Sequence, residues 1–332
     1  MFSKKTLVII GILVIAAFAL TACAGETGPA GPAGPEGPAG PAGPEGHAGM
    51  APSAADLTCT ECHNEGTALY VASQQWAKSL HATGTAAAYA GARSGCTGCH
   101  SSEGFTDATE IGSMEEAAAP LVASQQNCRT CHQIHTSYTG ADWALSTVEP
   151  VLLVANGETF DGGKGNLCAS CHQPRRAMEP GVEGMFEITS THWGPHHGPQ
   201  STMLLGQVGA GIEDNPGRHA MVEDTCVACH LGEAKDHDMG VNYATCAECH
   251  EDAEAMVEEL QAEVQELTDE VGELLEAKGL THDGHPNPGT YPEAEAQAAW
   301  NWIYIVLEDK SMGVHNPAYT IEMLEAALDV LR

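Results

Sequence analysis

The sequence repeats one five-residue pattern, Cys-x-x-Cys-His, at residues 59–63, 96–100, 128–132, 168–172, 226–230 and 246–250. Two thiols at this spacing can form thioether bonds to the two vinyl groups of one haem, and the His that follows can place its imidazole under the iron. For a single copy, a zinc knuckle or a redox-active cysteine pair is the alternative. Six copies, each with His directly after the second Cys, favour covalent c-type haem, and we expect six haems.

The motifs supply the predicted attachment thiols and one axial ligand for each iron. The thiols are Cys59, Cys62, Cys96, Cys99, Cys128, Cys131, Cys168, Cys171, Cys226, Cys229, Cys246 and Cys249. The proximal ligands are His63, His100, His132, His172, His230 and His250. Of the 13 cysteines only Cys23 lies outside the motifs, so no thiol pair is left for a disulfide.

Each iron also needs a distal ligand, or it keeps an open position. The chain has 17 His, enough for bis-histidine ligation of every haem, and His47 in the Gly-rich N-terminal segment is expected to be solvated. The predicted distal ligands are His81, His135, His197, His219, His237 and His315. His192 and His196 remain alternatives to His197, Met is the competing ligand type, and the pairing of each His with a haem stays open.

These motifs lie in a chain that we expect to be mainly α, with short helices and much irregular chain around the haems. Residues 51–250 form the predicted hexahaem domain. Only 5% of residues are aromatic, so the macrocycles must supply much of the apolar interior. Folding should then be coupled to haem attachment, and the apo-protein should be largely unfolded.

Residues 251–332 are expected to form a helical hairpin or bundle that supplies one distal ligand. A heptad pattern of apolar residues indicates a long helix, and two further amphipathic helices are expected near residues 292–307 and 318–331. The heptad positions are Val257, Leu260, Val264, Leu267, Val271 and Leu274. We favour a hairpin within the chain over a dimer, because the outer positions are nearly all acidic and unpaired.

The N-terminal segment predicts an exported lipoprotein. Lys4 and Lys5 precede an apolar run at residues 6–20, which is short for a membrane span. The sequence Leu-Thr-Ala-Cys ending at Cys23 resembles the lipobox of bacterial lipoproteins, so residues 1–22 are expected to be removed and Cys23 acylated. An uncleaved anchor is the alternative.

Residues 23–50 form a predicted spacer in which Gly recurs at every third position from Gly25 to Gly49, with many Pro, as in collagen. We favour a stiff single-chain spacer over a trimerising stalk. Either would hold the haem-binding part away from the membrane to which acylated Cys23 binds.

The formal net charge is −32. This charge excludes nucleic acid as a partner and suits cationic redox proteins, metal ions or mineral surfaces.

The motifs, together with His on predicted helices as in WAKSLHATG, resemble the multihaem cytochrome c superfamily of anaerobic respiration. Residues 296–320, AQAAWNWIYIVLEDKSMGVHNPAYT, are similar to the end of ammonia-forming cytochrome c nitrite reductases. The resemblance implies that His315 is a distal ligand and that the C-terminal helices form a dimer interface. Those reductases carry their substrate haem on Cys-x-x-Cys-Lys, a motif that this sequence lacks. The lipobox with six haems also resembles outer-surface and extracellular cytochromes.

Two functions follow as hypotheses. The first is a membrane-anchored electron conduit with closely packed bis-histidine haems, on the periplasmic face or outer cell surface, which passes electrons to other cytochromes or extracellular acceptors. The alternative is an oxidoreductase related to ammonia-forming nitrite reductase or hydroxylamine oxidoreductase, acting at one five-coordinate haem. We favour electron transfer over catalysis, because abundant His can close both faces of every iron.

Overall fold

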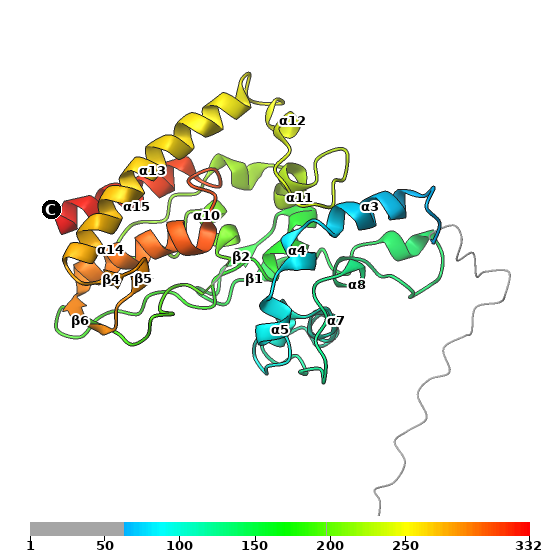
Figure 1. The fold of residues 1–332 in the computed structure, drawn as a ribbon, viewed down its shortest axis with the longest axis horizontal. Coiled ribbons are helices and arrows are strands. Elements are labelled where there is room, and N and C mark those ends of the chain that lie inside the picture. The colour runs from blue at the N-terminus through cyan, green and yellow to red at the C-terminus, as the bar shows by residue number, and fades with distance from the viewer. Residues whose placement is uncertain (1–62, 197) are drawn as a thin grey trace, which may run out of the picture. The chain divides into compact units, whose positions relative to one another are not determined.

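The structure is a computed structural model that describes residues 63–196 and 198–332, and its fold is mainly α, as the sequence predicts (Figure 1). The haem-motif region contains α3 (Ala68–Trp76), α4 (Leu80–Thr83), α5 (Ala86–Ala90), α6 (Thr97–His100), α7 (Ser102–Ile111), α8 (Cys128–Cys131), α9 (Asn166–Ala169), α10 (Gln200–Leu205), α11 (Thr225–His230) and α12 (Tyr243–Cys246). Between them lie the 3₁₀ turns η1 (Gly140–Trp143), η2 (Gly163–Gly165) and η3 (Arg218–Met221). Long irregular segments connect these short helices.

Short helices overlap the five Cys-x-x-Cys-His motifs that lie wholly within the described residues. The helices α6, α8, α9, α11 and α12 each begin or end inside a motif. The sequence fixes where some of them begin: the side chain of Asn127 caps α8 and that of Asn242 caps α12. One helical turn brings the two thiols and the His of a motif to the same side of the chain.

The helices of the C-terminal region are α13 (Ala253–Ala277), α14 (Glu293–Ile303) and α15 (Pro317–Leu331), and they pack on one another (Figure 1). The heptad residues of α13 face this bundle: Val264 and Val271 are fully buried beside Tyr319, Met323 and other α14 and α15 residues. The hairpin expected within the chain is therefore present. The second predicted helix continues past α14 as the π-helical segment η4 (Tyr304–Asp309).

Strands are short in the described part of the chain. The antiparallel pairs are β1 (Val151–Leu152) with β2 (Thr159–Phe160), β4 (Thr281–His282) with β5 (His285–Pro286), and β3 (Met185–Ile188) with β6 (Gly289–Pro292). The last pair joins the haem-motif region to the C-terminal region, since Phe186 lies opposite Tyr291. The two regions thus share one compact unit.

Within residues 63–196 and 198–332, every helix is too short or too polar to cross a lipid bilayer. The predicted signal segment, the acylation site Cys23 and the Gly-rich spacer lie outside the described residues.

Candidate haem-binding site

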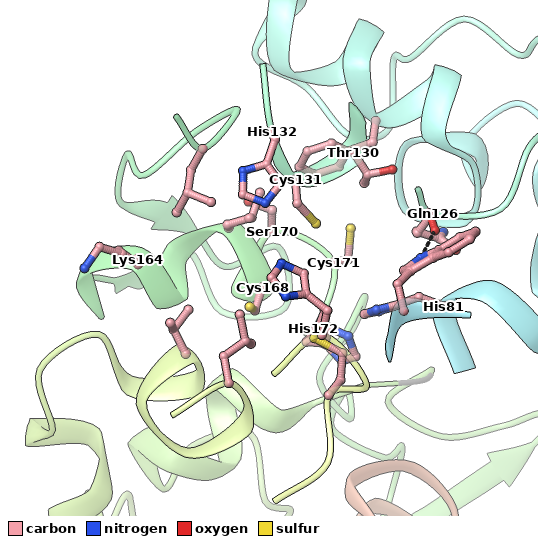
Figure 2. Close-up of a pocket in the computed structure, with 18 of the residues that line it drawn as sticks. His81, Gln126, Thr130, Cys131, His132, Lys164, Cys168, Ser170, Cys171 and His172 are labelled. Carbon is pink, nitrogen blue, oxygen red and sulfur yellow. Dashed lines mark hydrogen bonds between the residues drawn. The ribbon is translucent and has the colours of Figure 1, made fainter. Parts of the chain in front are cut away.

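A large cavity opens between the helices that carry the motifs (Figure 2). Its volume is about 1700 Å³, whereas a pocket for one drug-sized ligand measures roughly 300–1,000 Å³. Thiols and imidazoles of several motifs line it, and Figure 2 shows Cys131, Cys168, Cys171 and His172 around one shared space. The cavity therefore has the size and the reactive groups to hold more than one covalently attached macrocycle.

Histidines approach each other in pairs, and each pair joins a motif His to a His outside the motifs. The pairs His81–His172 and His132–His237 line the cavity. The ring centroids are 6.0 Å apart for His63 and His135, 6.1 Å for His81 and His172, 6.2 Å for His132 and His237, 6.3 Å for His219 and His250, and 6.3 Å for His230 and His315. The distal residues of these pairs are five of the six named from the sequence. The sixth, His197, lies outside the described residues.

This spacing fits an iron between two imidazoles. Two metal–nitrogen bonds of about 2 Å each, plus the distance from each nitrogen to its ring centre, place the centroids roughly 6 Å apart. Direct contact between stacked rings would bring them closer. All five His pairs have centroid distances between 6.0 and 6.3 Å, although they come from different segments of the chain. Such regularity is typical of the same kind of ligand bound between each pair.

The hydrogen bonds made by Nδ1 of these rings leave Nε2 available to bind a metal. Nδ1 donates to a backbone carbonyl in His132 (Trp143, 2.8 Å), His219 (Val314, 2.8 Å), His230 (Met239, 3.1 Å) and His237 (Lys235, 2.7 Å). With Nδ1 protonated, the lone pair of a neutral imidazole lies on Nε2. Such a bond to the second nitrogen is the usual way in which a protein orients a metal-ligating His.

Burial favours the neutral form of two of the paired rings. Burial, and secondarily the neighbouring His172, lowers the pKa of His81 to about 4. Burial likewise lowers the pKa of His172, whose ring is open to the cavity but otherwise surrounded by protein. A neutral imidazole is the form that binds a metal, so the surroundings favour the ligating state at neutral pH.

The pair formed by His230 and His315 has a different environment. Burial lowers the pKa of His315, but the carboxylate of Asp309 outweighs this effect and the pKa is raised overall. Nδ1 of His315 donates to Oδ1 of Asp309 at 2.7 Å. Asp309 was not identified from the sequence, because it reaches His315 only through the π-helical turn that ends at Asp309.

Gln200 is a second residue that sequence reasoning missed. Its Oε1 accepts from Nδ1 of His172 at 3.0 Å, and its Nε2 donates to the carbonyls of Glu308 and Asp309. Gln200 therefore orients one imidazole and fixes the turn beside another. No pattern near residue 200 indicates this role, since both partners are remote in sequence.

The motif thiols show which motifs are neighbours. Interaction with the Cys99 thiol raises the pKa of Cys171, and interaction with the Cys226 thiol raises the pKa of Cys168. The Cys131 thiol lies close enough to affect the charge of both Cys168 and Cys171, and Figure 2 shows the Cys131 and Cys171 sulfur atoms facing the same space. The motif at residues 168–172 thus borders the motifs at 96–100, 128–132 and 226–230.

The remaining predicted site residues divide by location. Cys59 and Cys62 of the first motif, and His47, which was expected to be solvated, lie outside the described residues. His192 is exposed, and His196 lines the cavity together with His100. The attachment and ligand roles assigned from the sequence stay predictions.

Comparison with family models finds no match, and comparison with curated proteins finds none either. Among solved structures, the chain is similar to the crystal structure of the outer cell wall cytochrome OcwA, with a TM-score of 0.53 and 22% sequence identity. The match covers 79% of this chain and 50% of that one, so the chain spans half the length of its structural neighbour. At this identity the likeness shows a shared fold.

Proposed function

We propose that this chain is an exported hexahaem c-type cytochrome that conducts electrons between redox partners. The observation that carries the proposal is the set of five imidazole pairs, each with centroids 6.0–6.3 Å apart and each containing one motif His. The likeness to a cytochrome fold supports it. Bound haem would supply an iron centre that accepts and releases one electron.

The protein's own contribution is to close both faces of each iron and to bring the sites together. Imidazoles on both faces leave no position for a substrate, so the centres exchange electrons and bind no small molecule. The fold brings thiols of neighbouring motifs close to one another, so that haems attached to them would lie near one another. Electron tunnelling weakens exponentially with distance, and such contact therefore allows transfer through the chain.

The contacts between motifs imply an order for the relay. His135 follows the third motif and faces His63 of the first, so these two motifs are neighbours. The fourth motif borders the second, third and fifth, and Cys229 of the fifth lies near Cys246 of the sixth. We infer a path through motifs 1, 3, 4, 5 and 6, with motif 2 as a branch at motif 4. A further contact links motif 3 to the segment between motifs 5 and 6, because His237 faces His132.

The mature protein is expected to carry six covalently attached haems, all low-spin when ferric. Intact mass spectrometry counts the haems, and electron paramagnetic resonance reports their spin state. Fewer than six haems would contradict the motif count. A high-spin haem that binds nitrite or hydroxylamine with turnover would instead support the alternative, a reductase or oxidase with one five-coordinate haem.

Export and anchoring belong to the same proposal, and they rest on the N-terminal sequence. Replacing Cys23 by Ser is expected to release the protein from membranes, because diacylation is what holds such a protein stably on lipid. Membrane fractionation measures this. The matched control is Ser3→Ala, which leaves Cys23 in place, and retention of the Cys23→Ser variant would contradict the lipobox.

The net charge of −32 supports cationic redox proteins or extracellular metal acceptors as partners. Dimers through the C-terminal helices, or trimers through the Gly-rich segment, remain predictions.

A further inference from the structure

One imidazole pair differs from the others in the charge of its hydrogen-bond acceptor. The Nδ1 acceptors of His132, His219, His230 and His237 are backbone carbonyls, and that of His172 is the neutral amide of Gln200. The acceptor of His315 is the carboxylate of Asp309. Among the rings whose Nδ1 bonds the structure describes, His315 alone is bonded to a full negative charge.

The Asp309 carboxylate is buried away from solvent and is held in place by hydrogen bonds. The Asp309 side chain is 0% exposed, and its ion-pair contact in the described part of the chain is with His315. Its second oxygen accepts from the hydroxyl of Ser311 at 2.5 Å and from the Ser311 backbone N–H at 3.2 Å. A carboxylate buried in this way interacts strongly with nearby charge, because little water screens it.

The local backbone aims the carboxylate. Asp309 ends the π-helical segment η4, and Lys310 after it adopts a left-handed conformation with φ of 61°. Gln200 clamps the turn through the carbonyls of Glu308 and Asp309. π-Helical turns are rare and are often found at functional sites.

We propose that Asp309 lowers the reduction potential of the haem held between His230 and His315. Electron transfer onto this haem would then be less favourable than without the carboxylate. A carboxylate on Nδ1 gives the imidazole partial imidazolate character, which strengthens its donation to iron. The negative charge of the carboxylate also stabilises the more positively charged ferric state relative to the ferrous state. This inference rests on the proposed haem function and on His315 as the distal ligand.

The position of this centre gives the lowered potential a consequence. Thiols of the fifth motif lie near thiols of the fourth and the sixth motifs. One route between the sixth haem and the fourth would therefore cross the centre that Asp309 controls. A second contact joins the segment between the fifth and sixth motifs to the third, because His237 faces His132. Asp309 would thus set how strong a reductant is needed to drive electrons along the first of these routes.

Asp309→Asn in the full-length holoprotein tests the proposal, because the amide keeps the size and the acceptor oxygen while removing the charge. We expect one of the six waves in a potentiometric titration to move to higher potential, and the low-spin resonance of one haem to shift. His315→Met identifies the wave of this haem independently, since Met ligation raises the potential. The wave moved by the two variants must be the same.

A control variant separates the charge beside His315 from the net charge of the chain. Glu266→Gln removes one charge from the exposed face of α13 and should leave the potentials unchanged. If Asp309→Asn moves no wave, or moves one that His315→Met does not, the proposal is wrong although the protein still carries six haems. If the wild-type protein lacks haem, the proposed function itself fails.

Discussion

Chain made without haem attachment will keep its C-terminal helices and lose the structure of the region before them. A cavity of 1700 Å³ left empty would cost up to about 40 kcal/mol at roughly 24 cal/mol per Å³, several times the 5–15 kcal/mol that stabilises a typical domain. Water entering the open cavity lowers this cost but does not replace apolar packing against the cavity wall. The C-terminal bundle has its own core, with Trp300, Tyr304 and Tyr319 fully buried.

Hydrogen exchange read by mass spectrometry measures this difference segment by segment. In a variant with all twelve motif Cys replaced by Ala, amide protection in residues 63–250 should fall by a factor on the order of 10³ or more, while α13, α14 and α15 retain theirs. The holoprotein is the control. Persistent protection of α6 to α9 in the haem-free variant would contradict the claim that haem forms the interior of this region.

Replacing His81 by Gly is expected to remove the distal ligand of the haem at the fourth motif, where the proposed relay branches. His81 faces His172 of the fourth motif, which borders three other motifs. The change should convert one of the six haems to high-spin and raise its potential. Electron transfer across the molecule should slow about tenfold or more, because an uphill step of 1.4 kcal/mol alone costs a factor of ten.

Free imidazole provides the matched rescue. It should enter the space left by the side chain and restore the low-spin resonance and the rate, which a merely misfolded variant would not recover. His285→Gly, at an exposed His outside the predicted ligand set, should change neither. A His81→Gly protein in which all six haems stay low-spin would remove His81 from the ligand set.

The sequence predicts the class of this fold and the residues that approach one another, but not their pairing. The mainly α fold and the C-terminal hairpin are confirmed, because heptad periodicity is a local signal. His81 and His315 could be named because each lies at a helix expected from the pattern around it. Their partners could not, since His315 faces His230 and His81 faces His172 through contacts between segments far apart in the chain.

Asp309 and Gln200 could not be identified from the sequence either, because they too take part in contacts between segments far apart in the chain. Residues 292–307 predict a regular helix, and a regular helix does not reveal the π-helical turn that directs Asp309 towards His315. Gln200 follows the stretch that holds His197 and carries no motif of its own. Such supporting residues are set by tertiary contacts, which a periodic pattern does not encode.

The pairing of remote histidines has a consequence for biogenesis. In a chain exported N-terminus first, His81 and His219 emerge before the motifs they face, so those two irons can be closed as soon as haem is attached. A haem on the fifth motif would instead have to wait for His315, which follows that motif far along the chain. Its iron would then keep one open position until the C-terminal helices have been exported.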